Sequence, residues 1–338
     1  MLVRTTAAAV TLLIVHGLFG GAAQAQDRFD RYGFDRPGYN VLGEPPSATA
    51  GVFVRYRPGA RGSADAQDRA SALARRRADY DELNPRVGIV HRIGNGPSLY
   101  GNLSRLYEPP TNFELEDNAA GGNATLDPMQ GTVFEIGFRG GRGTGEPGSI
   151  DWDVAIYHAA IDDEILSIDD PMAPGTSLTT NIDSTTHAGI EALIRSSHVM
   201  GLSGIRVEPL VSLTVNDFSF DNDPVYGNNE LPAAPGYFAR AEVMFRGPGG
   251  LFFGPTLDRV DTRWADFANS YQVEAHSLIG LRGGYARDKW RTFVELRNLT
   301  DKDYVAYHYV RDQVASDAAL LFRGEPLSAY VGFEMSLD

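Results

Sequence analysis

The chain has 338 residues, of which 44 are acidic and 30 are Lys or Arg, so its formal net charge is −14. This charge argues against nucleic acid as a partner, because binding to a phosphate backbone requires a basic face. The sequence contains no cysteine, which excludes disulfides, thiolate metal sites and thiol nucleophiles.

The first 25 residues have the three parts of a secretory signal peptide. Arg4 supplies a positive start, Ala7–Phe19 is apolar, and Ala23–Ala25 forms a small-x-small cleavage signal. The apolar run is too short for a transmembrane helix, which needs about 20 such residues. The alternative is that Leu12–Phe19 is a truncated strand of a membrane barrel. Both interpretations stay open, and no later segment is apolar enough to predict a spanning helix.

From residue 48 onward, apolar and polar residues alternate in many short segments. In Thr132–Arg139, for example, Phe134, Ile136 and Phe138 alternate with charged or small residues. Trp290–Arg297 shows the same period of two. Because successive side chains of a strand point to opposite faces, each segment is predicted to be a strand with one apolar and one charged face.

About twelve segments show this pattern, and their length of about 9 to 12 residues suits a tilted strand that crosses a bilayer. They lie near residues 48–58, 84–93, 97–107, 131–140, 150–165, 184–196, 205–220, 236–247, 250–262, 272–287, 289–299 and 327–337.

The segments between the predicted strands are of two kinds. Tight turns are predicted at Gly94–Pro97 and at Asp288–Lys289. The long polar connections are residues 108–130, 166–183, 221–235, 263–271 and 300–326. Short links at one end and long loops at the other are typical of outer-membrane barrels. We therefore predict an all-β fold, an antiparallel transmembrane β-barrel, here a partial barrel of about twelve strands. A soluble secreted β-sandwich, whose strands also alternate, is the alternative.

Several stretches also resemble a known family. They are NPRVGIVHRI (84–93), LYGNLSRLYEPPTNFEL (99–115), LDPMQGTVFEIGFRG (126–140), WDVAIYHAAIDDEILSI (152–168), STTHAGIEALI (184–194), NDFSFDNDPVYGNNELPAAPGYFARAEV (216–243) and FVELRNLTDKDYVAY (293–307). In this order they resemble the C-terminal barrel portion of TonB-dependent outer-membrane receptors. The pattern is most similar to the siderophore or ferric-citrate type.

The resemblance implies a place and a function. The charged strand faces would line a wide lumen, and the apolar faces would meet the lipid of a Gram-negative outer membrane. The expected function is uptake of a scarce ligand, such as a ferric siderophore or another iron chelate. The expected partners are outer-membrane lipid, lipopolysaccharide and the TonB energy-coupling protein. No cofactor is expected. A stand-alone small barrel, acting as a passive pore or an adhesin, is the alternative.

The family also implies a domain organisation. Its members carry an N-terminal plug and an energy-coupling box before a barrel of about 22 strands. Nothing before residue 48 is long enough to be a plug. We therefore expect a signal peptide or a truncated strand at residues 1–25 and a receptor-like barrel portion, without a plug, at residues 26–338.

Candidate binding residues come from the expected external loops. Tyr226, Tyr307, His308 and Tyr309 are the side chains predicted to touch a ligand, and packing within the loops is the alternative for each. In the motif that starts at Asn298, we expect the chain to leave the sheet and Tyr304 to anchor at a membrane interface.

Two carboxylate clusters, Asp162–Glu164 and Asp221–Pro224, could bind calcium, but we interpret them as solvated loop charge. The basic run Arg75–Arg77 is interpreted as a solvated loop, with lipopolysaccharide phosphate as the alternative contact. The sequence has no Ser-His-Asp order, no metal-binding His pair and no phosphate-binding loop, so we predict that the protein is not an enzyme.

Overall fold

The computed structural model describes residues 48–57, 82–111, 114–115, 126–143, 147–169, 177–287, 289–314 and 319–335. The predicted signal peptide and Arg75–Arg77 lie outside these residues. Within them, no helix is long and apolar enough to cross a membrane.

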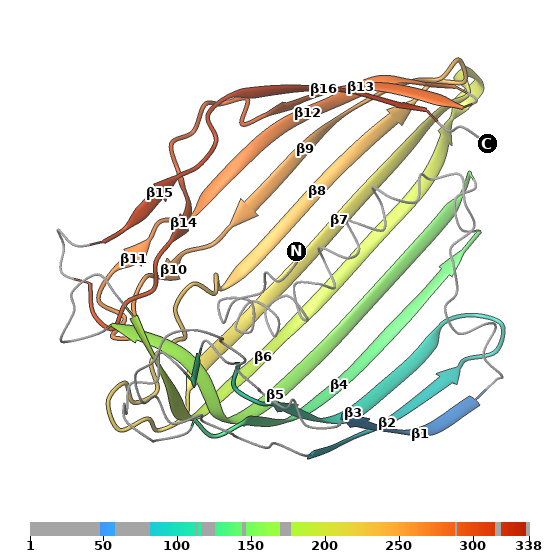
Figure 1. The fold of residues 1–338 in the computed structure, drawn as a ribbon. Coiled ribbons are helices and arrows are strands. Elements are labelled where there is room, and N and C mark those ends of the chain that lie inside the picture. The colour runs from blue at the N-terminus through green and yellow to red at the C-terminus, as the bar shows by residue number, and fades with distance from the viewer. Residues whose placement is uncertain are drawn as a thin grey trace, which may run out of the picture.

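One antiparallel sheet dominates the described structure. Its twelve strands pair in the order of the sequence, each with the next, so the topology is a simple meander (Figure 1). These strands are β1 (Ala48–Arg57), β2 (Glu82–Arg92), β3 (Ser98–Glu108), β4 (Met129–Arg142), β5 (Ser149–Asp169), β6 (Ser177–Met200), β7 (Ile205–Phe220), β8 (Tyr237–Arg246), β9 (Leu251–Val260), β12 (His276–Arg287), β13 (Trp290–Arg297) and β16 (Ser328–Met335). The sheet matches the twelve predicted strands segment by segment. In the part of the chain that the structure describes, β1 and β16 each pair with one neighbour and not with each other.

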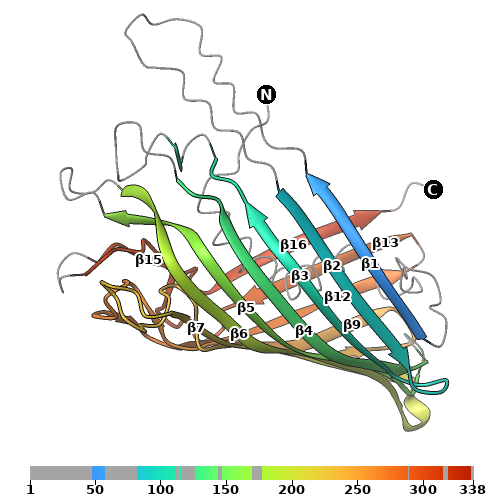
Figure 2. The same cartoon turned by 90° about the horizontal axis from the view of Figure 1, so that it is seen from below.

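The connections alternate between two ends of the sheet, as predicted. The turns 93–97, 143–148, 201–204, 247–250 and 288–289 are short and lie at one end. The described residues of the connections 109–128, 221–236, 261–275 and 298–327 lie at the other end. Figure 2 shows the strands β1 to β6 running side by side between these ends. The long connections carry two small hairpins, β10 (Arg263–Trp264) with β11 (Gln272–Val273) and β14 (Val305–His308) with β15 (Leu321–Arg323).

Strands β5 and β6 extend far beyond their neighbours. They have 21 and 24 residues, because the hairpin continues into the segment 166–183 that we predicted as a loop. The neighbouring ladders stop at Asp162 and Thr185, but β5 and β6 pair onward from Glu164 to Asp169. Asp163 has a positive φ of 57°, and the ladder is interrupted between Asp162 and Glu164 while its register stays the same on both sides. Beyond Asp163, Glu164 contacts Thr185 and His187 of the inner face, so it points to the opposite face from Asp162.

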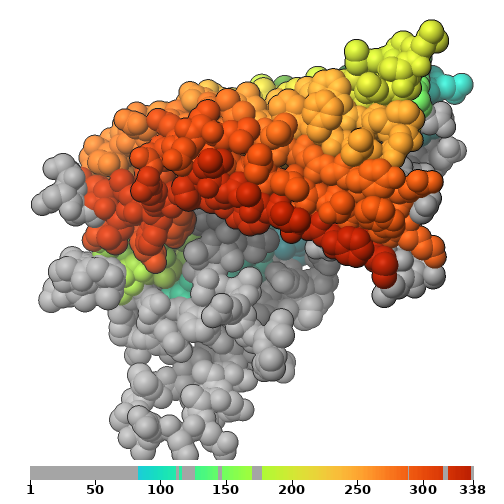
Figure 3. All heavy atoms as spheres, turned by 90° about the horizontal axis from the view of Figure 1, so that it is seen from above, coloured from blue at the N-terminus to red at the C-terminus, as the bar shows by residue number. Residues whose placement is uncertain are grey.

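The two faces of the sheet differ in polarity. Ile136, Ile156, Ile190 and Val215 lie directly opposite one another on four adjacent strands. They are 37% to 54% exposed, so they form an uncovered apolar band on what we call the outer face. The inner face carries the charged residues of the alternating pattern. The wall formed by the C-terminal strands is continuous in the space-filling view, where it is orange to red (Figure 3).

Glycines of the inner face make room for aromatic rings on the next strand. Tyr100 lies directly opposite Gly137, and Tyr157 lies opposite Gly189. A Cβ atom at either glycine would collide with that ring. Gly137 and Gly189 therefore have a packing role.

The buried apolar core lies at the end of the long connections. Its largest cluster joins the ends of β5, β6 and β7 to two connections, through Tyr157, Leu166, Ile182, Phe218, Phe220, Leu231 and Phe267. A smaller cluster consists of Ala265, Val273 and Val314, all from connections. We call the described residues of 221–236, 261–275 and 298–327 the loop layer. The loop layer, at the end of the strands (Figure 1), thus shares one hydrophobic cluster with β5 to β7 and has a second made only of its own residues.

Candidate functional site

Asp266 links two connections of the loop layer. Its side chain is fully buried, and Oδ1 accepts a hydrogen bond of 2.8 Å from the backbone N–H of Ser270. Its Oδ2 accepts another of 2.8 Å from the backbone N–H of Val314. A parallel bridge also joins Asp266 to Arg311. The connection after β9 and the connection after β13 are therefore fixed to each other.

A second group of hydrogen bonds connects the loop layer to the end of β5. The Arg311 Nε lies 3.2 Å from Asp169 Oδ2, which also accepts a hydrogen bond of 3.1 Å from the N–H of Asp312. In return, the N–H of Asp169 donates to Asp312 Oδ1 at 2.9 Å. Burial, together with the Asp169 carboxylate, raises the pKa of Asp312. The β13–β16 connection thus contacts β5, which lies six places from β13 in the sheet order.

Tyr226 belongs to the core of the loop layer. Its ring packs on Phe220 and Phe267, with centroids 5.1 and 5.4 Å away. Burial and the nearby Asp312 carboxylate raise the pKa of Tyr226 to about 12. Of the two roles considered for this residue, packing within the loops is the one that the structure displays.

Tyr307 and Tyr309 lie elsewhere, on the β14–β15 hairpin. Tyr307 belongs to β14, and Tyr309 comes just after that strand. Together with Phe322 they form a group of three rings whose centroids are 5.5 to 5.6 Å apart. We call these three residues the aromatic patch. Tyr307 is 55% exposed and Tyr309 is 52% exposed, so the patch presents its rings to the surroundings. The contacts of the patch do not include Tyr226, and the predicted residues therefore form two separate groups.

His308 points away from the aromatic patch, because it alternates with Tyr307 and Tyr309 along the chain. It is only 4% exposed. Burial, assisted by the positive charge of Arg263, lowers the pKa of His308 to about 4. The imidazole is therefore neutral near pH 7 and sealed beneath the hairpin.

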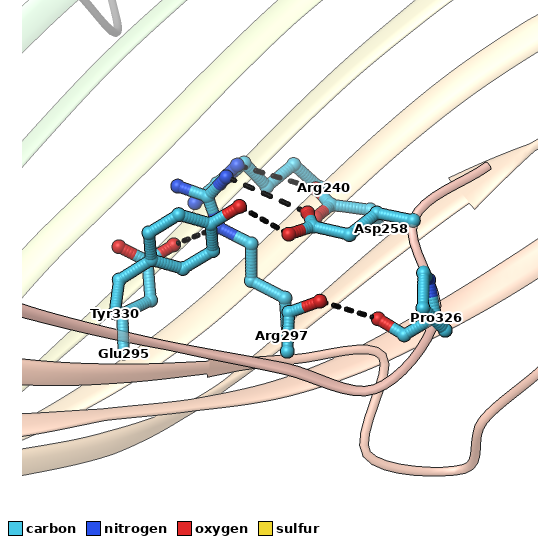
Figure 4. Close-up of polar contacts among 8 residues, drawn as sticks. Arg240, Asp258, Glu295, Arg297, Pro326 and Tyr330 are labelled. Atoms are coloured by element: carbon cyan, nitrogen blue, oxygen red, sulfur yellow. Dashed lines mark hydrogen bonds and ion pairs between the residues drawn. The ribbon is translucent and has the colours of Figure 1, made fainter.

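The inner face carries a cavity of about 660 Å³ between β8 and β16 that sequence reasoning did not single out. Its walls hold charges of both signs in balance: Arg240, Arg282, Arg291, Arg297, Asp258, Glu295, Glu325 and Glu334. Arg240 lies 3.4 Å from Asp258, and Arg297 donates to Glu295 at 2.7 Å and covers the Tyr330 ring (Figure 4). The signal in the sequence was the charged face of these strands, but strand register was needed to bring the charges together.

Three expectations from the sequence need correction. Glu164 is not solvated, because the left-handed backbone at Asp163 turns it inward, where it meets His187 at 3.1 Å and accepts a hydrogen bond from Thr185. Asp223 is also buried and accepts hydrogen bonds from two backbone N–H groups of its own turn. In the described residues, no group of three His, Cys, Asp or Glu side chains could hold a metal ion.

The third correction concerns the motif after β13. Asn298 leaves the sheet as predicted, with a positive φ of 50°, and its Nδ2 donates to the carbonyls of Lys302 and Glu325. Tyr304 does not face a membrane interface. Its ring packs on His276, with centroids 4.5 Å apart, and it lines the inner cavity. The chain turns at Asn298, and Tyr304 lies on the inner side of the sheet.

Comparison with known families agrees with this architecture. Residues 24–299 match the family model described as TonB dependent receptor-like, beta-barrel. The chain belongs to this family. The resemblance recognised in the sequence and the predicted antiparallel barrel fold are confirmed, and the family is one of receptors, as expected for a protein that is not an enzyme. The search of curated proteins found no match.

Solved structures share the fold at low sequence identity. The siderophore receptor PiuA from Acinetobacter baumannii is 16% identical with a TM-score of 0.65, over 86% of this chain and 41% of that one. The ferric yersiniabactin uptake receptor FyuA from Yersinia pestis is 16% identical with a TM-score of 0.59, over 77% and 38%. The ferric-catecholate import receptor Fiu from E. coli is 15% identical with a TM-score of 0.58, over 85% and 42%. This chain therefore spans about two fifths of the length of these structures.

Proposed function

We propose that this chain forms part of the wall of a receptor in the outer membrane of a Gram-negative bacterium. The receptor takes up a scarce ligand, a ferric siderophore or a related iron chelate, with energy supplied through TonB. The family and the structural neighbours support this proposal, since the neighbours include receptors whose names specify siderophores.

The proposal rests on one observation: side-chain polarity differs between the two faces of the sheet, and connection length differs between its two ends. Apolar side chains cover the outer face, charged side chains cover the inner face, and the described long connections lie at the same end. An apolar outer face suits contact with lipid. In the hydrocarbon layer, backbone N–H and C=O groups must be hydrogen-bonded within the sheet, and the exposed side chains must be apolar. A polar inner face suits a solvated or plugged passage.

The aromatic rings at the short-turn end support the same placement. Phe138 packs on Trp152, and Tyr285 packs on Trp290, which also contacts Phe333. Girdles of aromatic side chains near the strand ends are typical of the membrane interface of outer-membrane barrels. The short turns would then face the periplasm and the loop layer would face the outside.

Within this function, the aromatic patch is the surface that we assign to ligand contact. It is exposed at the end of the long connections, and contiguous exposed apolar groups often mark binding sites. Tyr226 and His308 would act indirectly, by supporting the loop layer and the hairpin from beneath.

The test is uptake of radiolabelled iron chelates by iron-limited cells of the native host. Cells with the intact gene, a deletion, and the variant Tyr307→Ala/Tyr309→Ala are compared, with and without functional TonB. We expect the deletion to abolish uptake of one chelate, the loss of TonB to do the same, and the patch variant to reduce uptake about tenfold or more.

The matched control is Leu202→Ala, which removes an exposed apolar side chain at the opposite end of the sheet. It should leave uptake unchanged. Uptake of every chelate by the deletion strain at the normal rate would contradict the proposed function. Recovery of the protein outside the outer-membrane fraction would contradict the proposed location.

A further inference from the structure

Three basic side chains are buried together beneath the β14–β15 hairpin. They are Arg263 from β10, His276 from the first position of β12, and His308 from β14. Their exposed fractions are 7%, 6% and 4%. Three different connections or strands thus converge on this position in the loop layer.

Several polar atoms of this group have no hydrogen-bond partner among the described residues. They are Arg263 Nη1, His276 Nδ1 and both ring nitrogens of His308. Arg263 makes one hydrogen bond within the protein, from Nη2 to the carbonyl of Val305 at 2.8 Å. The backbone at Trp264 lies near the His308 ring and that at Glu274 lies near the His276 ring, but both are outside hydrogen-bonding geometry for these nitrogens. Buried polar groups almost always have partners, so four such atoms in one place require an explanation.

The charge of the group is equally one-sided. The Arg263 guanidinium acts electrostatically on both imidazoles, and Arg259 and Lys302 add their positive charge near His276. Among the described residues, no carboxylate acts on Arg263 or on either ring. Buried charges in proteins are normally paired, because the cost of removing an isolated charge from water is high.

We propose that Arg263, His276 and His308 form a binding site for a small oxyanion of the phosphate or carboxylate class. The guanidinium would bind two of its oxygens, since its planar fork matches such groups, and the imidazoles would donate to it. The bound anion would neutralise the cluster and hold the hairpin against β10 and β12. This site is a property of the loop layer and does not depend on the imported ligand.

Access to the site requires the hairpin to move. β14 and β15 have only four and three residues, and their ladder is irregular between Val305 and Tyr307. So short a ladder has few hydrogen bonds to break, which makes local opening possible without loss of the sheet. The anion would then exchange slowly and protect the hairpin once bound.

The test uses the full chain in detergent micelles with inorganic phosphate or citrate, and chloride at equal ionic strength as the reference. We expect phosphate or citrate, but not chloride, to raise the unfolding temperature in a saturable way. In protein labelled at histidine, NMR should show the titration midpoint of His308 move upward when the anion is present. Arg263→Met should weaken anion binding about tenfold or more, because the charged fork is lost.

The matched control is Arg323→Met on the same hairpin, because Arg323 is exposed and pairs with Asp303. It should bind the anion like the wild type. His308→Gln provides a second variant, should Arg263→Met fail to fold, and it should weaken binding as well. The proposal is overturned if the wild type shows no saturable response to either anion, or if His308 titrates at the same pH with and without it. An equal response in the folded Arg263→Met or His308→Gln variant would also overturn it.

Discussion

The buried contact between Glu164 and His187 provides the most direct test of how the β5–β6 extension is held. The Nε2 and Oε2 atoms are 3.1 Å apart, and the two side chains are 1% and 2% exposed. Thr185 donates a further hydrogen bond to the same carboxylate, and His187 packs on Phe218 with ring centroids 4.6 Å apart. Water cannot reach either side chain, so the loss of one partner cannot be compensated by solvent.

We predict that His187→Leu destabilises the protein by about 3–5 kcal/mol, the usual cost of leaving a buried charge without its partner. That loss is a large part of the total stability of a typical protein, about 5–15 kcal/mol. The double variant Glu164→Met/His187→Leu removes both polar side chains and should recover most of the loss, because a well-packed apolar pair is often as stable as a buried charged or polar pair.

The assay is denaturant unfolding of the refolded chain in detergent, followed by tryptophan fluorescence and circular dichroism. His158→Leu is the control, because His158 lies on the exposed outer face of β5 and its replacement should change the free energy of unfolding by less than about 0.5 kcal/mol. A loss below about 1 kcal/mol for His187→Leu, or a double variant no more stable than the single one, would refute the reasoning.

Three further predictions concern the sheet and the loop layer. Gly137→Ala should cost about 1–3 kcal/mol in denaturant unfolding, because its Cβ collides with the ring opposite, whereas Gly101→Ala makes only ordinary contacts and should be milder. Asp266→Ala should speed hydrogen exchange at the amide of Val314 while leaving that of the β5–β6 ladder unchanged; unchanged exchange at Val314 would contradict the linking role. For His308, whose pKa falls to about 4 on folding, the unfolded state binds more protons, so stability should decrease as the pH falls from about 6.5 towards 4; a His308→Gln variant should lose this dependence in pH-dependent unfolding.

The strands could be predicted because their signal is local. Alternation such as that in Thr132–Arg139 depends only on neighbouring residues, and the outer band of Ile136 and Ile156 follows directly from it. The length of the connections was also visible in the sequence, and with it the division of the sheet into two different ends. The family resemblance rested on the same strands and turns.

The interior of the loop layer could not be predicted in this way. Asp169 and Arg311 are 142 positions apart in sequence, and neither carries a local signal that points to the other. Tyr226 and Tyr307 look alike in sequence, yet one is packed in a core and the other is exposed, because each position depends on which connections meet there. The left-handed backbone at Asp163 likewise turns Glu164 inward and converts an expected surface charge into a buried one.

The strand pattern, with its apolar and charged faces, and the order of short and long connections could be predicted from the amino-acid sequence alone. The two faces follow from the period of two along each strand, which is independent of the rest of the chain. Which charges are buried, which rings are exposed and where Arg263, His276 and His308 converge became known only from the folded structure. Those outcomes depend on strand register and on contacts between distant connections, and a shift of one residue in either is enough to reverse the face on which a side chain lies.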